Sequence, residues 1–258
     1  MNRFLRVALL VVFAGILAFS GYKVLSVLGE YQQADTLYEG VQQEFVEKVT
    51  TTTAATSAVG EQPEHKVTSS APIRVDFPGL MAKNKDVVGW LYCPDTVVNY
   101  PVVQAQDNDT YLHADLSGEY LRSGTLFVDC ENDPQPQVQK NYIVYGHSMK
   151  NGSMFGALLK YKKQTYYDEH PVWYYLTPDR DYRVELIVGT VVRTQRDIFT
   201  TTIDEKVMVK ELGVLQEYST FESEVSYSEE DAFITLSTCS YEFDDARYVL
   251  VGKLIPLN

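Results

Sequence analysis

The stretch AFITLSTCSYEFDDARYVLVGKL, residues 232–254, is expected to form two neighbouring strands. Apolar, β-branched runs at 233–236 and 248–254 flank a polar turn, which is the pattern of paired strands. Cys239 stands at the end of the first strand, and Arg247 stands at the start of the second. A thiol and a guanidinium so placed can face the same cleft. A cysteine used only for packing would more often stand inside an apolar run.

Composition excludes several classes of function. The chain has 258 residues, enough for one large domain or two small ones, and 45% of them are hydrophobic. Its net charge of −13 argues against nucleic acid as a partner and against polybasic docking on anionic lipid. Three cysteines cannot all pair, so no disulfide framework is implied.

Sequence motifs for metals and cofactors are also missing. Zinc needs three or four closely spaced ligands, and the chain has no Cys-x-x-Cys or His-x-x-x-His pattern. No G-x-S-x-G, phosphate loop or G-x-G-x-x-G occurs, and the DNDT run at 107–110 is too short for a calcium loop. We therefore expect neither a metal nor a cofactor.

The first 28 residues read as a membrane anchor. Residues 7–22 carry no charge, and apolar residues resume after Lys23. With Lys23 reaching toward the lipid headgroups, residues 4–28 are long enough to cross a bilayer. Arg3 and Arg6 precede the segment, which predicts that the remaining chain lies outside the cell. The alternative is a cleaved signal peptide, with 18–20 as the cleavage site.

Residues 29–70 are expected to connect this anchor to the main domain. Apolar residues at helical spacing predict a helix over 31–49, which either packs on the main domain or stands as a spacer. The Thr/Ser/Ala-rich run at 50–70 has no periodicity and is typical of a flexible linker. Residues 1–70 should therefore be removable without loss of activity, which leaves 71–258 as the catalytic domain.

The main domain is expected to be mainly β. Many short strands at even spacing, with a few helices in the connections, favour a closed or nearly closed β-barrel. Strands are expected at 87–92, 97–103, 125–128, 142–145, 172–176 and 182–192, besides the two at the C-terminal end, and helices at 77–85, 154–161 and 203–218.

His147 is the histidine best placed for chemistry. It follows an apolar strand and a glycine and precedes a Gly/Ser/Asn-rich segment, whereas the other three histidines lie in a tail, a loop and a turn. With Cys239 and Arg247 it supplies an acid/base, a nucleophile and a cation. From the residues alone, a structural histidine at a strand end fits equally well. Cys93 or Cys130 would also fit as the nucleophile, although core packing, with or without a bond between them, suits both.

Three separated motifs resemble the sortases, cysteine transpeptidases of the outer face of Gram-positive bacteria. TLSTC at 235–239, with Arg247 eight positions later, is similar to the family's cysteine signature, and YGHSM at 145–149 is similar to its histidine motif. The run at 86–112 and the helical segment at 203–218 resemble class B in particular. The resemblance covers about residues 77–257.

This resemblance implies a fold and a reaction. The fold would be the closed eight-stranded sortase-type β-barrel, with N-terminal helices and a helix between the sixth and seventh strands. Cys239 would attack a peptide bond of a sorting signal, of the NPQTN-like kind for class B. His147 would protonate the leaving amine, and Arg247 would stabilise the oxyanion. Ser237 and Thr238 would line the substrate groove.

The implied partners are secreted proteins with a C-terminal sorting signal and an amine of the peptidoglycan precursor. The implied location is the cell membrane, with a single span and the catalytic domain outside. A thiol peptidase that releases the peptide to water, a pilin-polymerising sortase and an inert surface-binding module are the alternatives. The acidic turn with Glu242, Asp244 and Asp245 is expected to alter substrate preference, or to pair with Arg247 when substrate is absent.

Overall fold

The structure, a computed structural model of the chain, describes residues 3–49 and 70–257; within α1 the side chains of 3–9 and 11 are not described. The linker expected at 50–70 therefore lies almost wholly outside the described residues. Contacts divide the chain into two compact units, Met1–Gly40 and Val41–Asn258.

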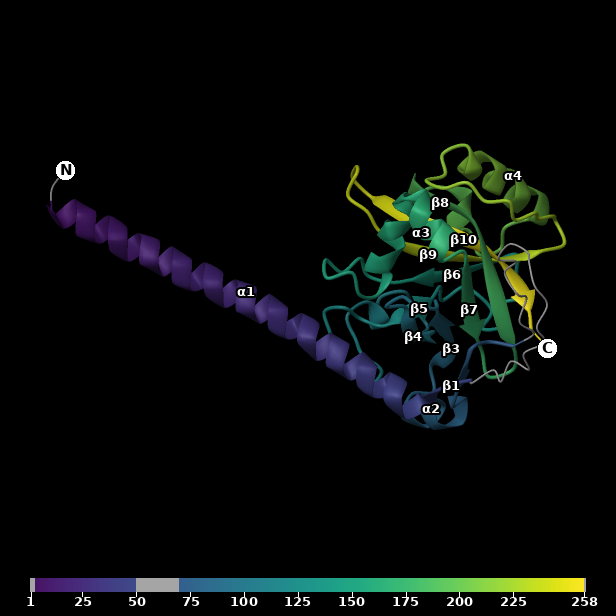
Figure 1. Cartoon of the computed structure of the whole chain (residues 1–258), viewed down its shortest axis with the longest axis horizontal. Helices are drawn as coiled ribbons and strands as arrows, with labels where there is room; N and C mark the ends of the chain where they lie inside the picture. Colours follow the sequence, from purple (N-terminus) through teal and green to yellow (C-terminus); the bar gives the residue numbers. More distant parts are fainter. Residues whose placement is uncertain (1–2, 50–69, 258) are drawn as a thin grey trace, which may run out of the picture. The chain divides into compact units, whose positions relative to one another are not determined.

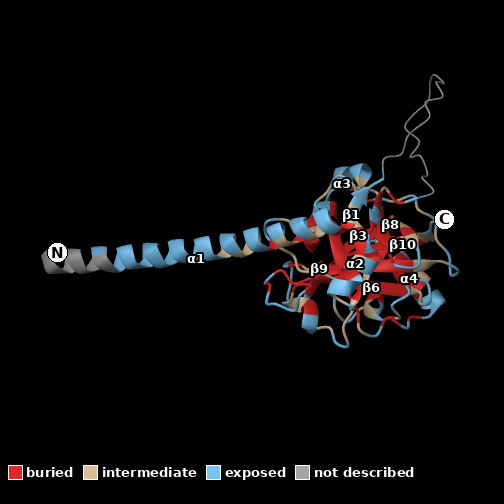
Figure 2. Ribbon diagram, turned by 90° about the horizontal axis from the view of Figure 1, so that it is seen from below, coloured by how far each residue is buried: buried red, intermediate tan, exposed pale blue. Residues whose placement is uncertain are grey.

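A single helix, α1 (Arg3–Phe45), runs without a break past residue 28, where an anchor and a stalk were expected to meet (Figure 1). Between Leu10 and Leu28 its large apolar side chains are mostly exposed, among them Phe13 and Leu25 (Figure 2). By length and composition the helix from Val12 onward can cross a membrane, although a signal sequence passes the same test. Both readings of the N-terminal segment therefore stand.

The last turn of α1 belongs to the second unit. Phe45 is buried in an apolar cluster with Ile73 and Leu80. The next residues form β1 (Val46–Lys48), which pairs antiparallel with β2 (Ile73–Val75). The sequence did not suggest this ribbon, because three-residue strands are too short to show a periodicity. The compact domain thus takes in residues well before 71.

Eight strands close into a barrel in the order β10-β8-β7-β3-β4-β5-β6-β9. This confirms the mainly β, eight-stranded barrel expected from the sequence. The strands are β3 (Val87–Tyr92), β4 (Asn99–Val103), β5 (Leu126–Val128), β6 (Asn141–Tyr145), β7 (Val172–Leu176), β8 (Asp181–Arg193), β9 (Ala232–Cys239) and β10 (Ala246–Pro256).

Helices fill the connections between these strands. The predicted helix between the sixth and seventh barrel strands is α4, and its Met208, Leu212 and Leu215 pack in an apolar cluster with residues of β8 and β10. A 3-10 helix, η2, replaces the α-helix expected near 154–161. The helical elements of the second unit are α2 (Phe77–Lys83), η1 (Thr110–Leu112), η2 (Phe155–Lys162), α3 (Gln164–Glu169), η3 (Asp197–Phe199) and α4 (Glu205–Gln216).

Strand β9 is central to the site because its two neighbours run in opposite directions. It pairs parallel with β6 on one side and antiparallel with β10 on the other. The C-terminal ends of β6 and β9 and the N-terminal end of β10 therefore meet at one end of the barrel. These are the strand ends that carry the residues singled out in the sequence, and the strands behind them are buried (Figure 2).

Candidate active site

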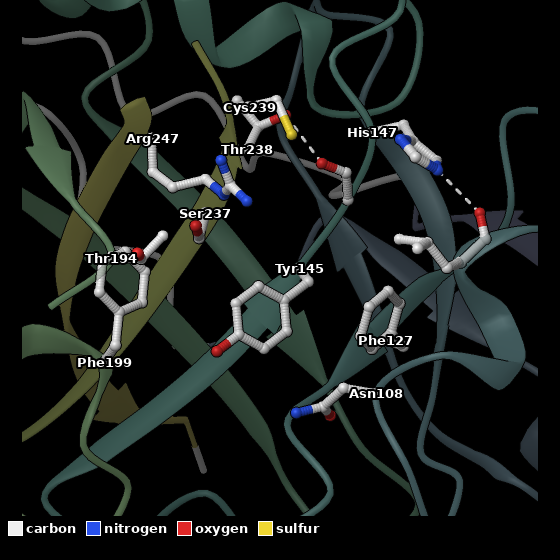
Figure 3. A pocket seen from close by; sticks show the side chains of 12 residues that line it. Asn108, Phe127, Tyr145, His147, Thr194, Phe199, Ser237, Thr238, Cys239 and Arg247 are labelled. Carbon is white, nitrogen blue, oxygen red and sulfur yellow. Dashed lines mark hydrogen bonds between the residues drawn. The ribbon is translucent and has the colours of Figure 1, made fainter. Parts of the chain in front are cut away.

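A cavity of about 270 Å³ opens where β6, β9 and β10 meet. All five residues predicted to form the site line it: His147, Ser237, Thr238, Cys239 and Arg247. In Figure 3 the sulfur of Cys239 lies between the guanidinium of Arg247 and the ring of His147. The cavity thus brings together an imidazole and a thiol that are 92 positions apart in the sequence.

Strand pairing sets the position of Arg247. Arg247 is the direct cross-strand partner of Cys239 in the antiparallel β9–β10 pair. Side chains of directly opposed residues point to the same face of a sheet, with Cβ atoms about 4.5–5.5 Å apart. The length of the turn between β9 and β10 sets this register and so places the guanidinium of Arg247 beside the thiol of Cys239.

The parallel pairing of β6 with β9 brings His147 to the same place. Tyr145 is in register with Ser237, and the N–H of Gly146 donates to the carbonyl of Ser237 at 3.2 Å. The hydroxyl of Thr238 in turn donates to the carbonyl of Gly146 at 2.7 Å. His147 and Cys239, each two residues beyond the last residue pair of the β6–β9 register, line the same cavity.

Gly146 makes room for this approach. A Cβ at this position would lie 2.4 Å from a methyl carbon of Leu126 and 2.8 Å from the ring of Phe155. Both neighbours are fully buried in the barrel, so neither has space to move aside. A glycine before His147 is therefore a packing requirement of the site.

Two consecutive residues, the last of η1 and the one that follows it, hold the imidazole. Nε2 of His147 lies 2.8 Å from the carbonyl oxygen of Leu112, and because a carbonyl only accepts, Nε2 must be the donor. The ring of His113 stacks on that of His147 with centroids 5.1 Å apart. Burial lowers the pKa of His147, the bond to Leu112 opposes this, and nearby His113 and Arg122 lower it further. The neutral imidazole is therefore favoured at neutral pH.

The three cysteines are free thiols in different surroundings. Cys93 is fully buried, and burial raises the pKa of its thiol to about 12. Burial and the carboxylates of Asp129 and Glu131 also raise the pKa of Cys130. Since the thiolate is the nucleophile, both are poorly suited to attack a carbonyl. Of the three, Cys239 is the one that lines the cavity with an imidazole and a guanidinium.

The two residues before the thiol differ in what their hydroxyls do. Oγ of Ser237 is buried and has no hydrogen-bond partner among the described residues. The hydroxyl of Thr238 is occupied by the carbonyl of Gly146. Because a buried hydroxyl without a partner is costly, Ser237 presents an open position for a polar group of a bound molecule.

The acidic turn does not neutralise Arg247. Within the described part of the chain Arg247 makes no ion pair, and its guanidinium donates to its own strand at the carbonyl of Ala246, at 3.1 Å. Glu242 instead pairs with Lys162 of η2 and accepts from Ser240, and these bonds lower its pKa to about 2. The pairing of the acidic turn with Arg247 is thus not seen, and the guanidinium remains open to the cavity.

Several cavity residues were not predicted as site residues from the sequence. They come from loops and strands whose neighbours only the folded barrel reveals: Asn108, Leu112, Phe127, Tyr145, Thr194 and Phe199. Asn108 stands in the DNDT turn, which the sequence presented only as a polar loop. A side chain on a loop can be assigned to a cavity only once the loop's position is known.

The chain is similar in sequence and in fold to known proteins. A sequence model of the Sortase domain matches residues 91–255. Sortase B of Listeria monocytogenes is 34% identical over 255 residues, 98% of this chain and 97% of the relative. A sortase B structure from B. anthracis in complex with AAEK1 matches with a TM-score of 0.71 and 30% identity, covering 89% of this chain and 99% of that chain. The Staphylococcus aureus sortase B–substrate complex matches with a TM-score of 0.66 and 30% identity, over 70% and 85% of the two chains.

Proposed function

The chain belongs to the sortase family as a class B cysteine transpeptidase, and on this premise we propose that Cys239, His147 and Arg247 carry out its reaction. The observation that supports the proposal is that these three side chains line one cavity. They supply the nucleophile, the proton carrier and the oxyanion donor that acyl transfer from a peptide requires.

In the first half-reaction the neutral imidazole of His147 takes the proton of the Cys239 thiol, and the resulting thiolate attacks the carbonyl carbon of the scissile peptide bond. The guanidinium of Arg247, opposite the thiol on β10, donates to the oxygen as it becomes an oxyanion. His147 then gives a proton to the departing amine, and the C–N bond breaks. A thioester between the peptide and Cys239 remains.

In the second half-reaction an amine attacks the thioester carbonyl. A new C–N bond forms, the C–S bond breaks, and the sulfur of Cys239 leaves as the thiolate. His147 accepts the proton that the attacking amine loses and passes it to the sulfur of Cys239. The enzyme is thereby restored, and the peptide has changed its amine partner.

The substrate we propose is the C-terminal sorting signal of a secreted protein. The matching Staphylococcus aureus structure is a sortase B–substrate complex, which supports this class of ligand. Ser237 would bind the peptide through its buried, unpartnered hydroxyl. Thr238 would shape the groove through its bond to Gly146, beside His147.

We propose the amine of a peptidoglycan precursor as the acceptor and the outer face of the cell membrane as the location. The apolar helix that starts near the N-terminus supports an anchor. Arg3 and Arg6 before it favour an N-terminus inside the cell and a catalytic domain outside.

Product analysis with a sorting peptide tests the proposal. Given an added amine such as a glycine oligomer, the wild-type chain should form a new amide, and Cys239→Ala should form none. Cys93→Ala and Cys130→Ala are the matched controls and should retain transpeptidation. If the peptide is only hydrolysed, whatever the amine concentration, the protein is a thiol peptidase. Loss of activity in Cys130→Ala with activity kept in Cys239→Ala would overturn the assignment of the nucleophile.

A further inference from the structure

A buried carboxylate lies directly behind the wall of the catalytic cavity. Asp129 follows β5 and is 6% exposed. Its Oδ2 accepts from the hydroxyl of Tyr145 at 2.9 Å and from the amide of Asn108 at 3.2 Å. Tyr145 and Asn108 both line the cavity, whereas Asp129 does not. The carboxylate therefore touches the site only through these two side chains.

The backbone of Asp129 is fixed from two sides. Its N–H donates to the carbonyl of Ile143 on β6 at 3.0 Å. Its carbonyl accepts from the side chain of Gln104 at 2.9 Å, and the same amide also bonds the carbonyl of Asn132 at 2.8 Å. Asp129 is thus held to the barrel framework and can keep the side chains of Tyr145 and Asn108 in place.

Asn108 depends on this support because it stands on a loop. Its Oδ1 accepts from the N–H of Cys130 at 2.9 Å, and its Nδ2 donates to Asp129. The two bonds together determine which way the amide faces. Without them a solvent-accessible asparagine on a polar turn has several rotamers of similar energy.

We propose that Asp129 is a positioning residue that orients Tyr145 and Asn108 as the peptide-binding wall of the site. The inference rests on the proposed function, because it assigns a role in binding the same peptide. It places Asp129 in substrate recognition and leaves the chemistry at Cys239 to other groups.

Substitution by asparagine is a sharp probe of this role. Three donors converge on the two oxygens of Asp129: Tyr145 and Asn108 on Oδ2, and the N–H of Glu131 on Oδ1 at 3.0 Å. An asparagine has one oxygen and one NH2 group, so its NH2 faces either the amide of Asn108 or the N–H of Glu131, and a donor meets a donor in both orientations. With the NH2 group toward Glu131, the bonds to Tyr145 and Asn108 persist but lose the negative charge that strengthens them. Asp129→Asn therefore weakens the support of the wall in either orientation, at nearly constant size.

Asp115 offers a matched control. It is a comparably buried carboxylate, 7% exposed, and it does not line the cavity. Ser117 N–H, Ser117 O–H and Glu119 N–H all donate to Oδ1 of Asp115. Since an asparagine keeps that oxygen, Asp115→Asn should preserve all three bonds.

Steady-state kinetics of the full-length chain with an NPQTN-type peptide test the proposal. Asp129→Asn should raise KM roughly tenfold with kcat changed less than about twofold, because binding rather than chemistry is affected. The rate at which a small neutral alkylating reagent modifies Cys239 should stay at the wild-type level. Asp115→Asn should match the wild type in all three quantities.

Tyr145→Phe, alone and combined with Asp129→Asn, completes a double-mutant cycle. It removes the hydroxyl that Asp129 holds, so its effect on KM and that of Asp129→Asn should be less than additive in the double variant. An unchanged KM in Asp129→Asn would overturn the inference while leaving the proposed function intact. A fall in kcat together with slower alkylation of Cys239 would also overturn it, since Asp129 would then act on the reacting groups.

A second readout needs no peptide. In a crystal structure of Asp129→Asn, the side chains of Asn108 and Tyr145 should occupy new or multiple positions while Cys239, His147 and Arg247 stay in place. Unchanged positions of both wall residues would contradict the proposed role, whatever peptide the enzyme accepts.

Discussion

At the scale of single residues, surroundings rather than residue type separate the three thiols. Cys93 and Cys130 have raised pKa values, and only Cys239 shares its cavity with His147 and Arg247. The sequence supplied the pairing of Cys239 with Arg247, because both belong to one predicted strand pair. From the residues alone His147 could equally be structural, and its role was assigned through the resemblance, because a parallel neighbour from a distant segment leaves no spacing to recognise.

Arg247→Lys tests the role of the guanidinium. Lysine keeps the charge but loses the planar fork that donates two parallel hydrogen bonds. We expect kcat/KM for peptide cleavage to fall on the order of 100-fold or more, since an oxyanion donor contributes about that much. Circular dichroism should show an unchanged fold. Near-normal turnover would mean that the charge alone suffices.

His113→Phe tests the environment of His147. Phenylalanine preserves the stacked ring but removes a neighbour that disfavours a second positive charge. The pKa of His147 should therefore rise, while burial and Arg122 still hold it below its ordinary value. An NMR titration of the His147 ring in the wild type and the variant measures the change. A lower pKa in the variant would contradict this view of the stack.

At the scale of elements, the turn between β9 and β10 is fixed at its outer end. Glu242 bonds both Lys162 of η2 and Ser240. The guanidinium of Arg193 on β8 also lies over the ring of Phe243, with the guanidinium carbon 4.6 Å from the ring centroid. The turn that joins the thiol to Arg247 is thus attached to two other elements. The sequence predicted the turn and its acidity but not these attachments, which depend on η2 and β8 lying beside it.

Lys162→Met should remove the contribution of the Lys162–Glu242 ion pair to the free energy of unfolding, and this contribution should depend on pH. Glu242 has an ordinary pKa of 4.5 that is lowered to about 2 in the fold, so the pair stabilises the fold above about pH 4.5 and loses its effect as the pH falls toward 2. The two side chains are 34% and 40% exposed, so the contribution at neutral pH is below about 1 kcal/mol.

Urea unfolding of the wild type and Lys162→Met checks this. The wild type should be more stable at neutral pH, and the difference should vanish near the folded pKa of about 2. Lys163→Met, at the exposed next position, is the control and should show no such pH dependence. A difference that persists unchanged in acid would show that Lys162 stabilises the fold by packing.

The regular strands of the barrel were predictable to within a few residues, and the short elements were not. The apolar run over Val87–Tyr92 has the predicted bounds. The strand expected at 97–103 begins at Asn99, because Thr96 closes a turn by bonding the carbonyl of Cys93. β1 and β2 were missed because their stability comes from the cluster around Phe45 and not from a local pattern.

At the scale of the whole molecule, the barrel was predictable from the many short strands and from the resemblance. The residue at which the compact domain begins was not. The sequence placed the tether up to residue 70, yet Val41, Phe45 and Val46 pack in an apolar cluster of the second unit. A Thr/Ser/Ala-rich segment marks a linker in composition, but it does not say on which side of it the core begins.

Two truncated chains test where the domain starts. A chain that begins at Val41 keeps Phe45 and β1, whereas one that begins at Ala71 loses both. Removal of a buried phenylalanine costs about 3–5 kcal/mol, or roughly 6–20 °C in Tm at this domain size. We therefore expect the Ala71 chain to melt that much lower, with Phe45→Ala in the Val41 chain reproducing most of the loss. Equal Tm values for the two chains would place the start of the domain at residue 71.

The most direct test of the account is to locate the acyl group during turnover. The full-length chain is incubated with a sorting peptide in the absence of amine, quenched in acid, digested and mapped by mass spectrometry. The thioester should lie on the fragment that contains Cys239 and disappear on addition of a glycine oligomer. An adduct on Cys93 or Cys130, or turnover without any thioester, would contradict the assignment of Cys239 as the nucleophile.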